Sequence, residues 1–73
     1  MRGQWISVKA AEAIAKREVP QAEHGKIWIL PGFCYAFGVT GYRVQIYYEL
    51  TRYDLFLDAV NGEVLRKRES YIR

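Results

Sequence analysis

His24 and Cys34 are the one pair of side chains in this 73-residue chain that could act as a nucleophile and its base. A cysteine thiolate attacks an electrophilic carbon once a neighbouring imidazole has removed its proton. However, His24 falls in a polar connection and Cys34 stands among small residues of a β-rich segment, with no supporting motif around either. We therefore favour a solvated loop histidine and a buried cysteine that packs as a small apolar side chain.

Carboxylates offer a second chemistry, because Asp54 and Asp58 alternate onto one face of a predicted strand with Glu49 nearby. Three carboxylates can hold a cation. Asp58 has a turn to stabilise, and we expect the other two to be solvated. One cysteine and one histidine cannot build a zinc site. The sequence also lacks a phosphate-binding loop, a Gly-x-Ser-x-Gly elbow and a paired-histidine metal motif. We therefore predict a protein that is not an enzyme and has no metal or other cofactor.

The positive charge is concentrated at one end of the chain. Residues 1–65 carry seven basic and seven acidic side chains, so the formal net charge of +3 comes entirely from residues 66–73. Arg66, Lys67 and Arg68 dominate this basic end. Such a segment attracts nucleic acid or an anionic surface. The interpretation we prefer is a charged last strand that protects a sheet edge from aggregation.

The segment from Ser7 to Val19 is predicted to be a helix. Ser7 is a good N-cap, apolar residues including Val8 and Ile14 recur every three or four positions, and Pro20 stops the helix. The many alanines make the helix thin, so it can approach its support closely.

The chain after Gly25 is typical of β-strands. The expected β-rich segments are 26–30, ended by Pro31-Gly32, then 33–39, 42–50, 53–60 and 63–72. The segment 33–39 alternates aromatic with small residues and leaves two alternatives open. Either Phe33, Tyr35 and Phe37 lie exposed and mark an interface such as a homodimer, or they form the core, which is the commoner outcome.

The two hairpins can be placed in register. A turn at Thr51-Arg52 would put apolar pairs such as Ile46 and Leu57 opposite each other on one face. At Asn61-Gly62 we prefer a bulged turn, because it pairs Leu57 with Leu65 rather than with an arginine. This turn needs Gly62 at positive φ and Asp58 bonded to the turn amides.

One helix covers only one face of such a sheet, so the other face is a candidate binding surface. This face would carry Arg43, Gln45, Tyr47, Glu49, Asp54 and Phe56. In the predicted register Tyr47 stands opposite Phe56 with Arg43 nearby, and aromatic residues with arginine are typical of binding hot spots. The alternative, which we slightly prefer for Tyr47 and Phe56, is a cross-strand pair that only stabilises the sheet. The candidate partner-binding residues are Arg43, Tyr47, Phe56, Arg66, Lys67 and Arg68, and the structural turn residues are Asp58, Asn61 and Gly62.

These elements predict an α+β fold in one domain, residues 1–73, with an N-terminal helix packed on an antiparallel sheet of three to four strands. The longest uncharged stretch, 27–42, is interrupted by Pro31 and several glycines, so no membrane span is expected. No signal peptide is evident either. We expect a cytoplasmic protein unless the chain is excised from an exported precursor.

Two stretches of the chain resemble a PepSY domain. They are the alanine-rich Ile6–Ala15 and the hairpin Leu57–Leu65, in which Asp58, Gly62 and Glu63 match the pattern. The resemblance spans about Ile6 to Arg68. PepSY domains occur in propeptides of secreted metallopeptidases and in other exported or anchored bacterial proteins. The resemblance therefore implies a non-catalytic module that binds a protein partner, with inhibition or modulation of a peptidase as its expected role.

Two other functions fit the residues. A small nucleic-acid-binding protein would use the basic C-terminal strand together with Tyr47 and Phe56. A phage-type intracellular inhibitor would fit the small size and the missing export signal.

Overall fold

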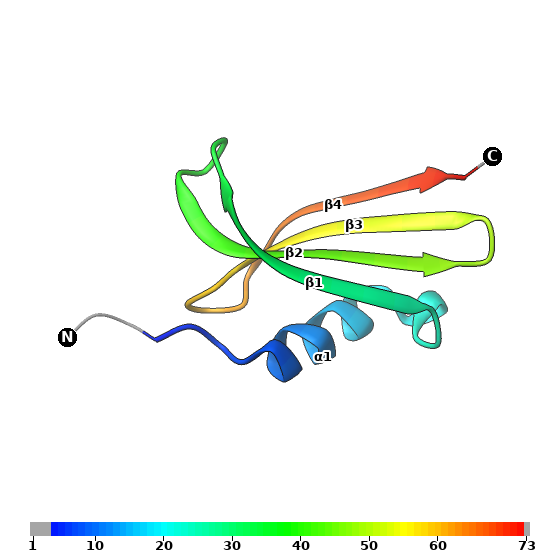
Figure 1. Ribbon diagram of the computed structural model, residues 1–73, viewed down its shortest axis with the longest axis horizontal. Coiled ribbons are helices and arrows are strands. Elements are labelled where there is room, and N and C mark those ends of the chain that lie inside the picture. The colour runs from blue at the N-terminus through cyan, green and yellow to red at the C-terminus, as the bar shows by residue number, and fades with distance from the viewer. Residues whose placement is uncertain (1–3, 73) are drawn as a thin grey trace.

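The computed structural model describes residues 4–72 and shows one helix packed on one face of a four-stranded antiparallel sheet (Figure 1). The strands follow chain order, β1-β2-β3-β4, so each pairs with the next along the sequence. This confirms the predicted α+β fold. The elements are α1 (Val8–Glu18), a short 3-10 turn η1 (Pro20–Ala22), β1 (Lys26–Cys34), β2 (Val39–Tyr48), β3 (Thr51–Asp58) and β4 (Val64–Tyr71).

Helix α1 begins and ends where its sequence predicts. The Ser7 hydroxyl accepts a hydrogen bond from the Ala10 amide at 3.0 Å, which satisfies one free donor of the first turn. Ala11 and Ala15 are fully buried, so the small side chains bring the helix close to the sheet. Val8 is 53% exposed, so its assignment to the apolar stripe is wrong. None of the helices among residues 4–72 is long and apolar enough to cross a membrane.

The core lies between α1 and the alternating apolar residues of the sheet. Val44, Ile46 and Leu57 are at most 1% exposed. The segment before the helix closes one end of this core: the Ile6 amide donates to the Ala59 carbonyl at 2.7 Å, and the Tyr42 hydroxyl donates to the Ile6 carbonyl at 2.8 Å. The sheet face toward α1 is therefore buried in the core.

Strand β1 runs through Pro31-Gly32, so the predicted strand end at these residues is wrong. Pro31 pairs with Tyr42, and Gly32 with Gly41. Because β1 is an edge strand, one side of its backbone has no neighbouring strand, and proline is tolerated there. The predicted separate strand at 33–39 does not form, since residues 35–38 make the turn between β1 and β2.

The β2–β3 hairpin turns at Glu49-Leu50 and not at Thr51-Arg52, so the predicted register is wrong: each β2 residue pairs with a β3 residue four positions earlier than predicted. Ile46 faces Tyr53, and Tyr47 faces Arg52. Glu49 takes a φ of 55°, a conformation rare for a residue other than glycine. Because side chains alternate along a strand, a shift by an even number of residues, here four, keeps every side chain on its predicted face.

The β3–β4 turn is held by Asp58. Its Oδ1 accepts from the Val60 amide at 2.8 Å, and its backbone carbonyl accepts from the Gly62 amide at 2.8 Å. Gly62 has a φ of 74°, and the Asn61 side chain accepts from the Glu63 amide. A bulge is present, but Leu57 pairs with Val64 instead of the predicted Leu65. Four residues between Asp58 and Glu63 form the loop, one more than predicted.

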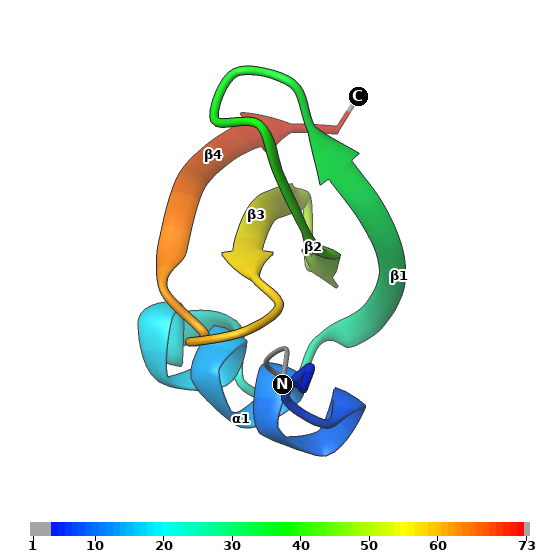
Figure 2. The same ribbon diagram turned by 90° about the vertical axis from the view of Figure 1, so that its left-hand side faces the viewer.

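Viewed along its length, the sheet curls away from α1, with β1 and β4 rising on either side (Figure 2). The β1–β2 turn bends over the same side. The face opposite the helix is therefore concave, and we call it the open face.

Candidate functional site

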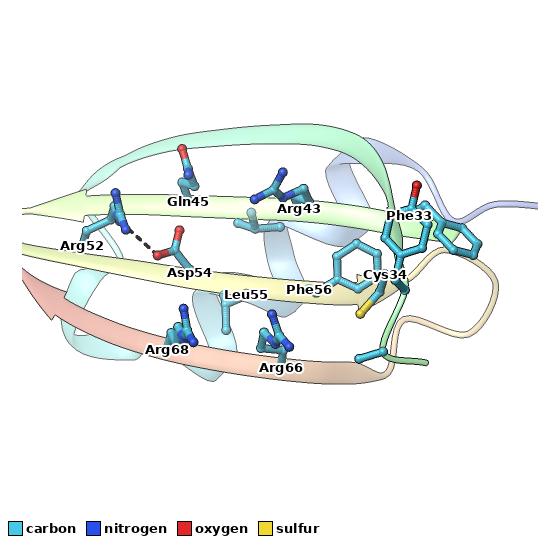
Figure 3. Close-up of a pocket in the computed structure, with 13 residues that line it drawn as sticks. Phe33, Cys34, Arg43, Gln45, Arg52, Asp54, Leu55, Phe56, Arg66 and Arg68 are labelled. Atoms are coloured by element: carbon cyan, nitrogen blue, oxygen red, sulfur yellow. Dashed lines mark hydrogen bonds and ion pairs between the residues drawn. The ribbon is translucent and has the colours of Figure 1, made fainter. Parts of the chain in front are cut away.

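A groove of about 520 Å³ lies on the open face. Polar side chains from β2, β3 and β4 project into it, and aromatic residues near the β1–β2 turn border one end (Figure 3). The polar side chains are Arg43, Gln45, Arg52, Asp54, Arg66 and Arg68. We refer to this feature as the arginine groove.

Strand register brings these residues together. Arg43 pairs with Phe56, and Phe56 pairs with Arg66, so the three form one row across β2, β3 and β4. Gln45, Asp54 and Arg68 form the next row in the same way. Neighbouring strands lie about 4.8 Å apart, so Arg43 and Arg66 flank Phe56 with backbones roughly 10 Å from each other.

The floor of the arginine groove is the ring of Phe56, which is only 6% exposed. It covers a pair of glycines: a methyl group added at Gly41 would stand 3.0 Å from the ring, and one added at Gly32 would stand 3.9 Å from it. An aromatic ring over paired glycines supplies the contact that their missing side chains cannot make. Phe56 therefore shapes the groove and exposes little of itself to a partner.

Positive charge dominates the arginine groove. Asp54 is its one carboxylate, and it pairs with Arg52 at 3.0 Å. A side-chain hydrogen bond with Tyr47, and then the charge of Asp54, raise the pKa of Arg52 above its ordinary value. Among residues 4–72, no ion pair involves Arg43, Arg66 or Arg68.

Four arginines against one carboxylate leave three positive charges in the groove, which equals the formal net charge of the whole chain. The basic and acidic side chains elsewhere balance. The excess charge is thus gathered on one concave surface, and only part of it comes from the basic C-terminal strand.

Exposed aromatic residues border the end of the groove near the β1–β2 turn. Phe33 is 48% exposed and Tyr35 is 88% exposed, with their ring centroids 4.8 Å apart. Phe37, in the same turn, is 54% exposed. Of the two alternatives that the sequence left open, the structure therefore has the one in which these aromatics are exposed, since their segment turns beyond the helix-covered part of the sheet. They supply an apolar surface next to the arginines.

The remaining predicted partner residues divide between the two faces. Tyr47 lies on the open face, but its ring stacks edge-on with Trp28 at 5.3 Å and does not pair with Phe56. Lys67 lies on the helix side, where its ammonium group pairs with Glu18 at 3.3 Å. Arg66 and Arg68 share the groove with Arg43.

Strand alternation placed Gln45 on the uncovered face with Arg43 and Tyr47, and it lines the groove. Arg52 is a groove residue that the sequence interpretation missed, because it was assigned to the turn. The same alternation, continued two positions back from Asp54, was the signal for it. Phe33 and Tyr35 were named as aromatics, but the sequence did not show that their turn curls toward the arginines.

The residues considered for catalysis or cation binding do not come together in a site. The whole length of β1 separates His24 from Cys34, and Cys34 is only 9% exposed. Asp58 serves the β3–β4 turn while Asp54 pairs with Arg52. In the stretch from residue 4 to residue 72, no three His, Cys, Asp or Glu side chains gather in a metal-binding arrangement. The arrangement is suited to holding anions through guanidinium groups.

The model of the PepSY family, described as "Peptidase propeptide and YPEB domain", matches residues 6–68. No curated protein and no solved structure matches this chain.

Proposed function

The chain belongs to the PepSY family, and we propose that it is a non-catalytic module that binds a protein partner and inhibits or modulates it, the partner being a peptidase. The observation that carries this proposal is the match of the family model over residues 6–68, which spans the helix and nearly the whole sheet. The family description names the peptidase propeptide, a segment whose role is tied to a peptidase.

The open face is the surface we assign to the partner. The opposite face is occupied by α1, whereas the arginine groove leaves Arg43, Arg66 and Arg68 exposed. Arginine and aromatic residues are enriched in the parts of interfaces that contribute most to affinity. Tyr47 and Phe56 belong to this surface, Phe56 as its floor. Lys67 is left out of it, because it lies on the helix side.

The test is capture on the immobilised chain followed by an activity assay. Proteins retained from the source cells are identified, and any peptidase among them is purified and assayed with increasing amounts of the free chain. We expect its rate of proteolysis to change in proportion to the chain added and to level off at one chain per enzyme. Retention of a small molecule with no protein, or a peptidase rate that the chain leaves unchanged, would contradict the proposal.

A further inference from the structure

We propose that the arginine groove receives an extended acidic segment of the partner, with carboxylates at alternate positions and an apolar side chain at one end. This inference rests on the proposed function in taking the partner to be a protein. It adds the chemistry of the segment that is recognised and the residues that recognise it.

The arginines of the groove carry positive charge that can attract an acidic segment. Arg43, Arg66 and Arg68 have exposed side chains and form no ion pair within residues 4–72. A guanidinium group presents its donors in a planar fork that matches both oxygens of a carboxylate. Three such forks on one concave surface leave room for several carboxylates of one partner segment.

The spacing of the arginines along β4 matches the spacing of alternate residues in an extended segment. Arg66 and Arg68 are two residues apart on β4 and project from the same face, so their backbones are separated by roughly 6.6 Å. Carboxylates at alternate positions of an extended segment repeat at the same distance of roughly 6.6 Å. An extended acidic segment lying along β4 can thus meet both arginines without changing its conformation. Arg43, across the floor from Arg66, remains for a carboxylate on the other side of the segment.

The aromatic end of the groove and Asp54 in its middle favour a protein segment as the ligand. Phe33 and Tyr35 form an exposed apolar surface at one end, which suits an apolar side chain of the segment. Asp54 stands in the middle of the groove beside Arg68 in the strand register. Because Arg52 pairs with this carboxylate, the pair adds no net positive charge here, whereas a nucleic acid brings a phosphate at every nucleotide. A peptide can avoid Asp54, because it carries its charges on separate side chains. These features favour a protein segment over DNA or RNA.

The experiment uses a fluorescently labelled synthetic peptide of alternating Glu and Thr with a terminal Leu. The matched probe has Gln in place of every Glu, and a third probe is single-stranded DNA of similar charge. Binding is followed by fluorescence anisotropy at physiological ionic strength. Two variants with equal loss of charge are compared: Arg66→Gln with Arg68→Gln in the groove, and Lys9→Gln with Arg17→Gln on the exposed side of α1.

We expect the acidic peptide to bind and the Gln peptide to bind at least about tenfold more weakly, since the arginines act on charge. The groove variant should lose at least about tenfold in affinity, and the helix variant less than about twofold. Arg43→Gln, on a different strand, should weaken binding as well. Thermal unfolding of each variant verifies that the fold is kept.

Equal binding of the acidic and Gln peptides would overturn the proposal. So would an equal loss in the two double variants, because it would mean that general charge attraction holds the peptide. Tighter binding of DNA than of the acidic peptide would identify the groove as a nucleic-acid site instead. If the acidic peptide does not bind but the chain still changes the rate of a captured peptidase, only this inference is wrong. If the peptide binds and the chain changes the rate of no captured peptidase, the proposed function is wrong.

Discussion

Gly62→Ala is expected to destabilise the protein for two separable reasons. Gly62 has a φ of 74°, and an alanine in the left-handed region costs about 1–2 kcal/mol. A methyl group at this position would also stand 2.7 Å from Cδ1 of Ile14 in α1. The terminal methyl of Ile14 must then move aside, and a side chain held about 30° off its rotamer costs about 0.5–1.5 kcal/mol. Alanine also restricts the unfolded chain, which offsets about 0.4–1 kcal/mol.

The net loss in the free energy of unfolding is therefore about 0.5–3 kcal/mol, with a central value of about 2 kcal/mol. A domain of this length has a total stability of about 4–11 kcal/mol, so the loss is a substantial fraction. At roughly 4–8 °C per kcal/mol, the unfolding midpoint should fall by about 10 °C. Thermal unfolding followed by circular dichroism measures this shift.

Gly38→Ala is the matched control, because Gly38 also has a positive φ, 65°, but an added methyl group there meets nothing within 4 Å. The two variants share the backbone cost and the effect on the unfolded chain. Gly62→Ala should therefore be the more destabilising of the two by about 1 kcal/mol. Combining Gly62→Ala with Ile14→Val, which removes Cδ1, should recover this difference as a coupling between the two sites. Equal shifts for the two glycine variants and no coupling to Ile14 would show that the close contact between Gly62 and Ile14 does not affect stability.

Three further predictions concern local contacts, each measured by thermal unfolding. Asp58→Ala should cost about 1–2 kcal/mol, because the Val60 amide loses its 2.8 Å acceptor, whereas Asp58→Asn keeps an acceptor oxygen and should cost clearly less; equal losses would argue against this hydrogen bond. Ser7→Ala should cost about 1 kcal/mol through loss of the helix cap, and Ser7→Asp should restore most of it; a neutral Ser7→Ala would contradict the capping role. His24→Ala should change stability by less than about 0.5 kcal/mol, because His24 is exposed; a larger loss would show a contact that the structure does not contain.

The sequence predicts best where a local signal has a single structural solution. Ser7 and Pro20 bound α1 because a cap and a proline act within one turn of the helix. Likewise, glycine at positive φ and an aspartate facing free amides place the β3–β4 turn. Alternation of polar and apolar residues assigns β2 and β3 to their faces, since only the period of two matters for this.

Prediction from the sequence fails where the structure depends on the exact position of a turn or on which strands lie next to each other. Glu49-Leu50 lacks the Gly and Asn residues that mark hairpin turns, and Glu49 adopts its positive φ only because the paired strands impose it. Pro31-Gly32 usually ends a strand, but it is accommodated here because β1 lies at the edge of the sheet. Neither fact can be read from the residues before the sheet order is known.

The arginine groove was predicted in part. Strand alternation placed Arg43 on the face away from the helix, and the basic C-terminal strand pointed to Arg66 and Arg68. The sequence alone did not separate Lys67 from these two, and it did not bring Arg52 into the same surface. Both results depend on the true register and on the curl of the sheet, which gathers side chains from β2, β3 and β4.

Whether a partner binds the open face can be read from the amide chemical shifts of the isotope-labelled chain as a captured partner is added. We expect the changes to concentrate on the open-face residues of β2, β3 and β4, including Arg43, Asp54 and Arg66. The exposed side of α1, at Lys9 and Arg17, should change little. Changes concentrated on α1, with the open face unaffected, would contradict the assignment of the partner to the arginine groove.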